Sequence, residues 1–150
     1  MRAHPSLALG FVLSVLLAFL ACCAPSEESR QAVLTFDGKT CHYEGPEILS
    51  EGVLTVTLVN ESEYDADLWA VKIEEGKTWQ DMLDHIGTPG SYVHFPEWSG
   101  GIMTAQVPDN PDAKVFTLTE GLYAFCCCTC EEVVGPQGVW PGASLQVKGK

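Results

Sequence analysis

Apolar and polar residues alternate along most of the chain after residue 30, and a period of two is typical of half-buried β-strands. Short runs rich in branched and aromatic residues are separated by turn residues such as Gly, Pro, Asn and Asp. The pattern predicts seven or eight strands, within 31–36, 39–43, 53–60, 66–73, 101–107, 113–119, 122–128 and 143–149. Close spacing of strands without βαβ alternation predicts an all-β, antiparallel sandwich or barrel.

One segment, 77–86, has a different period. Its apolar residues fall at positions i, i+3, i+4 and i+7, the spacing that places them on one face of a helix. These residues are Trp79, Met82, Leu83 and Ile86. Thr78, followed three residues later by Asp81, suits a capping box, and Gly87 suits the end of a helix. The sequence therefore predicts one short helix.

The N-terminal 21 residues form a separate segment. Arg2 and His4 precede an uncharged apolar run over 7–21. A positively charged start followed by such a run is the pattern of an export signal. The run is shorter than the roughly 20 apolar residues that a membrane-spanning helix needs. We therefore expect residues 1–21 to be a signal peptide.

Two adjacent cysteines, Cys22 and Cys23, follow this leader and precede a polar, acidic stretch that ends at Arg30. The arrangement resembles the lipobox of bacterial lipoproteins, in which a small-residue site ends at a cysteine that is lipidated. The resemblance implies a lipid on one of the two cysteines and a flexible tether over 22–30. It also implies a location in the cell envelope, outside the cytoplasm, with the membrane as partner. An ordinary signal peptide with incidental cysteines is the alternative.

Charge and motifs limit the classes of function. The 150 residues include 8 Lys+Arg and 20 Asp+Glu, for a formal net charge of −12, without a basic cluster. Nucleic-acid binding needs concentrated positive charge, so the composition argues against it. No nucleophile-elbow motif or phosphate loop occurs. Asp65 and Asp67 match no Ca²⁺ loop and are expected to be solvated. We expect one non-enzymatic domain over 31–150.

The last predicted strands carry a family resemblance. Residues 118–127 spell Leu-Thr-Glu-Gly-Leu-Tyr-Ala-Phe-Cys-Cys, and 138–147 contain Gly-Val-Trp-Pro-Gly and then Leu-Gln-Val. These runs are similar to the cupredoxin family, whose last strands carry Gly-Xaa-Tyr-Xaa-Phe-Xaa-Cys, a loop with a His, and Leu-Xaa-Val. The resemblance implies a cupredoxin-like, Greek-key β-sandwich, with Cys127 at the position of the copper thiolate. The Cys-x-Tyr-x-Gly-Pro context of Cys41 also looks like cupredoxin-like proteins of bacterial envelopes.

The other copper ligands of the family are missing. Ala66 and Asp67 stand where the first copper His is expected, and no His lies within 129–142. Val139 and Trp140 occupy the position of the axial Met. A blue-copper site needs two imidazoles and a thiolate. The resemblance therefore implies the fold without an electron-transfer copper centre.

Four cysteines fall within five positions near the C-terminus: Cys126, Cys127, Cys128 and Cys130. Alternate residues of a strand face opposite sides, so Cys126 and Cys128 are expected on one face and Cys127 on the other. One interpretation is structural, because exported domains commonly contain disulfides. The candidates for such a bond are Cys41 and Cys127. This structural interpretation implies a non-catalytic binding or envelope-structural module without a cofactor.

Two other interpretations of the cluster remain open. In the first, its thiolates hold Cu(I) or Zn(II), with His42 or His94 as an added ligand. In the second, the chain is a thiol oxidoreductase. Glu131 and Glu132 disfavour that role, because nearby negative charge raises the pKa of a thiol.

The loop over 87–101 is the candidate binding edge, because it is dense in Gly, Pro and aromatic residues. Its candidate side chains are Tyr92, His94, Phe95 and Trp98. Such a loop either presents these groups to a partner or packs them into the core, and the sequence leaves both outcomes open.

Overall fold

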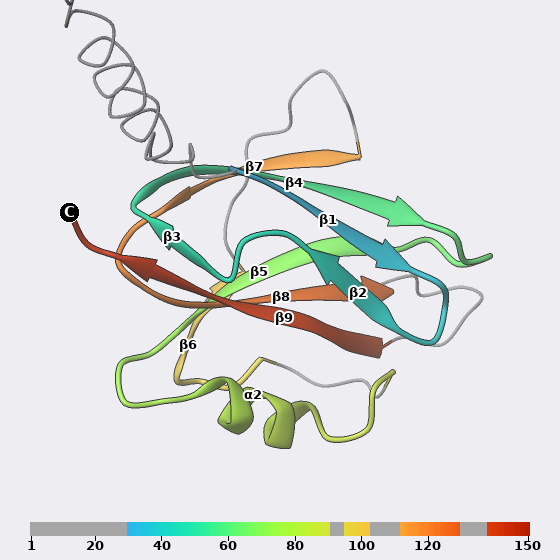
Figure 1. The fold of residues 1–150 in the computed structure, drawn as a ribbon. Coiled ribbons are helices and arrows are strands. Elements are labelled where there is room, and N and C mark those ends of the chain that lie inside the picture. Colours follow the sequence, from blue (N-terminus) through green and yellow to red (C-terminus); the bar gives the residue numbers. More distant parts are fainter. Residues whose placement is uncertain (1–29, 91–94, 103–111, 130–137) are drawn as a thin grey trace, which may run out of the picture.

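The computed structural model describes residues 30–90, 95–102, 112–129 and 138–150. The elements in chain order are β1 (Gln31–Phe36), β2 (Cys41–Glu44), β3 (Ile48–Ser50), β4 (Gly52–Asn60), β5 (Asp67–Ile73), α2 (Trp79–Ile86), β6 (Ser99–Ile102), β7 (Ala113–Leu118), β8 (Gly121–Thr129) and β9 (Gly138–Lys148). The strands form a four-stranded sheet, β2-β1-β4-β7, and a five-stranded sheet, β3-β9-β8-β5-β6. The two sheets face each other, and α2 lies on the far side of the five-stranded sheet (Figure 1).

The all-β sandwich with one helix is confirmed, although its strand pairing is mixed. Most neighbouring strands are antiparallel, but β1 pairs with β4 and β3 pairs with β9 in parallel. The reason is the path of the chain. After β2 the chain crosses to the other sheet, adds β3 beside β9, and returns as β4 beside β1. A period of two identifies strands but carries no information on such crossings.

The start of the last strand differs from the expected one because of a bulge in β9. Phe125 pairs with Ala143 and Cys126 pairs with Pro141, so Gly142 is an extra residue in β9. This bulge lets β9 continue through a Pro-Gly pair that resembles a turn, and β9 therefore begins at Gly138 rather than at 143. The short strand β3 was not predicted at all. Of the strand predicted at 101–107, only its first two residues, within β6, lie among the described residues.

The helix prediction is confirmed together with its caps. The Thr78 hydroxyl accepts a hydrogen bond from the backbone N–H of Asp81 at 3.1 Å, and the Thr78 N–H donates to the Asp81 carboxylate at 2.8 Å. At the other end, Gly87 has a φ of 67° and donates its N–H to the carbonyl of Leu83. Met82 and Ile86 are buried against the five-stranded sheet. The predicted apolar stripe is therefore the packed face.

Two apolar clusters lie on opposite faces of the five-stranded sheet. The first fills the space between the sheets and includes Leu34, Phe36, Phe116, Phe125, Cys127 and Trp140. The second lies between the sheet and α2 and includes Val71, Ile73, Met82, Ile86, Cys126 and Cys128. Strand β8 contributes alternate residues to both clusters, so it is buried on both faces.

The expected leader and tether, including Cys22 and Cys23, lie outside the described residues. The helix α2 is too short to cross a membrane. The described residues contain no other helix that is long and apolar enough to do so.

Candidate functional site

A disulfide between Cys41 and Cys127 links the two sheets. Cys41 lies on β2 of the four-stranded sheet and Cys127 on β8 of the five-stranded sheet, with their Cα atoms 5.7 Å apart. Cys127 is fully buried and Cys41 is 8% exposed. The predicted pair is therefore confirmed. Because its sulfur is already bonded to another sulfur, Cys127 has no thiolate to give to a metal ion.

The surroundings of this bond are closely packed. A Cβ atom on Gly142 would lie 3.2 Å from the Cys41 sulfur and 2.9 Å from the backbone oxygen of Phe125. Only glycine fits at the bulge without moving its neighbours. Phe36 pairs with Cys41 and Trp140 pairs with Cys127 in the strand register, and the rings of Phe36 and Trp140 lie 4.8 Å apart. The bond is thus a structural part of the inter-sheet core.

Cys126 and Cys128 face the opposite side of β8, as the strand period predicted. Both side chains are buried in the cluster beneath α2. Burial raises the pKa of the Cys126 thiol to about 12, against a smaller opposing effect of a backbone hydrogen bond involving Gly142. A thiol with this pKa stays protonated at neutral pH and is a poor nucleophile or metal ligand.

The Cys126 thiol is expected to resist alkylation in the native protein at pH 8 and to react only on unfolding. Its pKa is raised above the usual value of 9.0, so this group stabilises the fold fully below about pH 9 and loses that contribution as the pH rises through about 12. Mass spectrometry after iodoacetamide treatment, with and without urea, measures the protection. Cys126→Ala identifies the labelled position, and rapid labelling of Cys126 in the native protein would contradict the prediction.

The remaining predicted metal ligands are not gathered in the described part of the chain. There, no three His, Cys, Asp or Glu side chains lie close enough together to hold a metal ion. His42 is exposed and lies 3.5 Å from the carboxylate of Glu44. Cys130 and His94 lie outside the described residues.

The described part of the aromatic loop packs onto the domain itself. Phe95 and Trp98 are partly buried against the cluster beneath α2. The ring of Phe95 lies 5.2 Å from that of Trp69, and the ammonium of Lys77 lies 5.5 Å from the centre of the Trp98 ring. Tyr92 and His94 lie outside the described residues. The sequence left open whether these side chains face a partner or pack into the domain. Phe95 and Trp98 pack into the domain.

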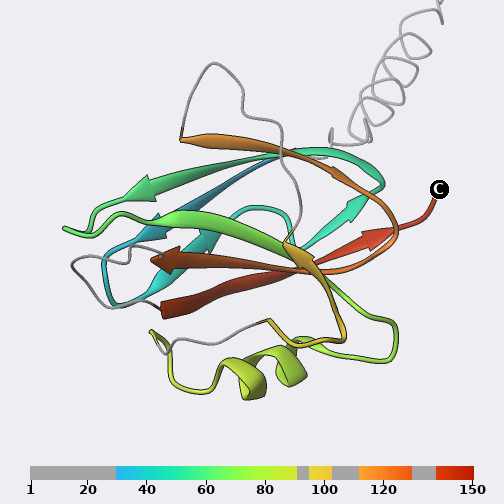
Figure 2. The same ribbon diagram turned by 180° about the vertical axis from the view of Figure 1, so that it is seen from behind.

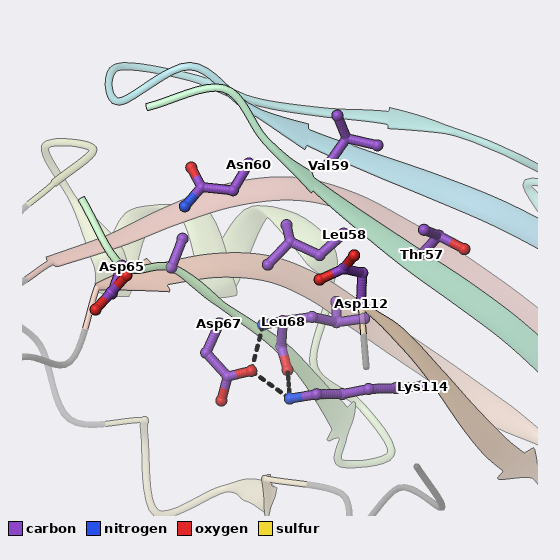
Figure 3. A pocket seen from close by; sticks show the side chains of 10 residues that line it. Thr57, Leu58, Val59, Asn60, Asp65, Asp67, Leu68, Asp112 and Lys114 are labelled. Atoms are coloured by element: carbon purple, nitrogen blue, oxygen red, sulfur yellow. Dashed lines mark hydrogen bonds and ion pairs between the residues drawn. The ribbon is translucent and has the colours of Figure 1, made fainter. Parts of the chain in front are cut away.

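A cavity of about 500 Å³ lies at the end of the sandwich, between the end of β4, the start of β5 and the start of β7 (Figure 3). Its lining residues are Thr57, Leu58, Val59, Asn60, Asp65, Ala66, Asp67, Leu68, Asp112 and Lys114. The volume lies within the range of small-molecule sites, roughly 300–1,000 Å³. Sequence reasoning considered two of its carboxylates but expected them to be solvated.

An inward-facing lysine organises this cavity. Lys114 pairs across the sheet with Val56, a core residue, so its side chain enters the sandwich and is only 23% exposed. Its ammonium forms an ion pair with Asp67 and donates to the carbonyl of Leu68 at 3.1 Å. The same Asp67 oxygen accepts the N–H of Leu68 at 2.9 Å. A lysine sharing a strand face with Phe116 is the sequence signal that could have revealed this site.

The cavity combines an acidic rim with an apolar floor. Leu58 and Ala66 pack against the inter-sheet core. The charged groups of the described lining are three carboxylates and one ammonium, those of Asp65, Asp67, Asp112 and Lys114. No His or Cys occurs among the described residues that line it. The arrangement can attract a cationic group and hold its apolar part.

Fold and site together define a β-sandwich whose two sheets are joined by a disulfide, with a polar cavity at one end. No protein-family model and no curated protein matches the chain. It is similar to the structure of Na-dithionite-reduced auracyanin from the photosynthetic bacterium Roseiflexus castenholzii, with 18% identity and a TM-score of 0.35. The likeness covers 77% of this chain and 98% of that chain, and it carries no functional argument.

Proposed function

We propose that this chain is a membrane-anchored, extracytoplasmic lipoprotein whose β-sandwich is a non-catalytic binding or structural module of the cell envelope. The buried Cys41–Cys127 disulfide carries the proposal. Disulfides persist in oxidising compartments outside the cytoplasm and are rare within it. The export-signal pattern of residues 1–21 supports the same compartment.

The anchor rests on the two cysteines that follow the leader. Cys22 or Cys23 carries the lipid, and the polar segment that ends at Arg30 serves as the tether. Arg30 donates hydrogen bonds to the Ser50 carbonyl at 3.3 Å and to the Ser50 hydroxyl at 3.2 Å, so the domain begins at this residue. A single acyl chain gives marginal membrane binding, whereas more than one gives a stable anchor.

Metabolic labelling tests the anchor. The full chain expressed in a bacterium is expected to incorporate a labelled fatty acid, and the double variant Cys22→Ala/Cys23→Ala is expected to lose all of it. The two single variants identify the modified cysteine. Cys126→Ala is the matched control and should retain the label. Absence of label from the wild-type chain would overturn the lipoprotein proposal.

The binding role rests on the cavity at the end of the sandwich. Its three carboxylates and apolar floor suit a small organic cation with a hydrocarbon part, such as an alkylamine. The Lys114–Asp67 ion pair fixes one wall of this cavity.

Counting thiols separates this proposal from the two cysteine-based alternatives. Denatured protein is expected to show at least two more reactive thiols after reduction than before it, because one disulfide opens. Metal analysis of the same sample is expected to find no stoichiometric copper or zinc. An unchanged thiol count together with bound Cu(I) or Zn(II) would favour metal handling. A disulfide reduced readily in the native protein would favour the oxidoreductase.

A further inference from the structure

The cavity at the end of the sandwich has more negative than positive charge in its described lining. Asp65, Asp67 and Asp112 supply three carboxylates, and Lys114 supplies one ammonium. Two negative charges therefore have no opposite charge within the described lining. A concave site with one excess sign of charge and low-dielectric walls concentrates ions of the opposite sign. The excess here matches a ligand with two positive charges.

The sequence offers few other cations that could neutralise this charge. Arg30 donates a hydrogen bond to Ser50 at the start of the domain, and Lys39, on the exposed turn between β1 and β2, is not among the lining residues. Three segments outside the described residues contain no Lys or Arg in their sequence, 91–94, 103–111 and 130–137. Lys114 is therefore the one Lys or Arg in the described lining of the cavity.

The carboxylate of Asp67 can accept a second cation. Its contacts with the Lys114 ammonium and with the N–H of Leu68 both involve Oδ1. Figure 3 shows Oδ2 pointing away from these two partners, and the side chain is 51% exposed. An ammonium group of a ligand can therefore bind Oδ2 while Lys114 stays in place. The two ammonium groups then repel each other across one carboxylate.

An apolar surface lies among the carboxylates. In Figure 3 the side chain of Leu58 is seen between those of Asp65 and Asp112. Leu58 and Ala66 pack against the inter-sheet core, which holds this surface in place. A hydrocarbon chain can cover Leu58 and lose its contact with water, while ammonium groups at its two ends form charge-assisted hydrogen bonds with carboxylates.

The cavity lies at the end of the sandwich opposite the start of the domain. Arg30 binds Ser50 beside the start of β4, whereas Asn60, at the other end of β4, lines the cavity. The nine residues of β4, at about 3.3 Å each, separate these ends by roughly 25–30 Å. Figures 1 and 2 show β3 at one end and the arrowheads of β1 and β4 at the other. An anchor upstream of Arg30 therefore leaves the cavity remote from the membrane.

We propose that the end cavity binds a water-soluble aliphatic diamine in its doubly protonated form. One ammonium group lies between Asp65 and Asp67, the other lies at Asp112, and the hydrocarbon chain covers Leu58. Lys114 limits the affinity, because its ammonium repels the ligand. This inference rests on the proposed binding role of the cavity, and the aqueous source of the ligand rests on the proposed anchor.

Isothermal titration calorimetry of the full chain in a nonionic detergent tests the ligand class. The probes are 1,5-diaminopentane and pentylamine, which have the same hydrocarbon chain but two and one ammonium groups. The diamine is expected to bind at least about tenfold more tightly. Asp67→Asn is expected to weaken its binding at least about tenfold. Glu63→Gln is the matched control and should leave the affinity unchanged, because Glu63 is exposed and does not line the cavity.

Lys114→Met tests the role of the lysine with a change of the opposite sign. Removal of the competing ammonium is expected to tighten diamine binding at least about threefold. Lys39→Met removes the same charge outside the lining and is expected to have no effect. A residue that only supports the fold would give weaker binding when replaced. Unchanged or weaker binding by Lys114→Met would therefore overturn its assignment.

The source of the ammonium group is tested by competition. Vesicles containing phosphatidylethanolamine present the same group in a lipid headgroup, and they are expected not to displace the diamine. Displacement by these vesicles, or equal affinity for the diamine and the monoamine, would overturn the inference and leave the binding role of the cavity standing. If neither amine bound, both the inference and that binding role would fail. Fatty-acid labelling reports on the anchor separately.

Discussion

Replacing Cys41 and Cys127 together with alanine is expected to lower the free energy of unfolding by about 4 kcal/mol. The bond joins residues separated by 86 positions in the sequence. Opening so long a loop returns conformational freedom to the unfolded chain, and the chain-entropy model gives a loss of this size. Urea unfolding followed by the fluorescence of the four tryptophans measures the effect.

A reducing agent provides the control for this prediction. Adding dithiothreitol to the urea titration is expected to lower the free energy of unfolding of the wild-type protein. It is expected to leave that of the double variant unchanged. Cys126→Ala removes a buried sulfur without opening a disulfide, so its cost is expected to be about 1–2 kcal/mol. A double variant no less stable than Cys126→Ala would show that the link between the sheets contributes little.

Phe125→Ala is the second substitution with a large expected effect, a loss of about 3–5 kcal/mol in the free energy of unfolding. Phe125 lies on β8 and is fully buried between the sheets. Its ring lies 6.0 Å from that of Tyr43 on β2 and 5.8 Å from that of Phe116 on β7. Truncation therefore leaves a cavity where the two sheets meet. Chemical denaturation of the variant measures the loss.

Val53→Ala is the matched control for Phe125→Ala. It also shortens an apolar side chain on a strand, but Val53 is largely exposed, so a change within about 0.5 kcal/mol is expected. If Phe125→Ala cost no more than Val53→Ala, the packing of the inter-sheet core would not be a main source of stability.

The cysteines show what the alternation of residues along a strand can predict and what it cannot. The alternation of residues was enough to place Cys126 and Cys128 on one face of β8 and Cys127 on the other. It does not by itself give the partner of Cys127. That partner, Cys41, comes from a strand in the opposite sheet.

The cavity was beyond sequence reasoning for a similar reason. Lys114 and Asp67 are 47 residues apart and lie in different sheets. Each residue alone resembles an ordinary surface charge. Their contact forms only because β7 and β5 both lie at the open side of the sandwich, where an inward-facing lysine can reach across to a carboxylate.

Local chemistry decided most of the elements of this protein. Alternating residues, turn residues and a capping box sufficed to predict the strands and the helix α2, because these signals act between residues a few positions apart. The tertiary structure decided the crossing that places β3 in the second sheet, the parallel pairs and the bulge at Gly142. These features depend on contacts between distant strands, whose free energies appear only when the two sheets pack together.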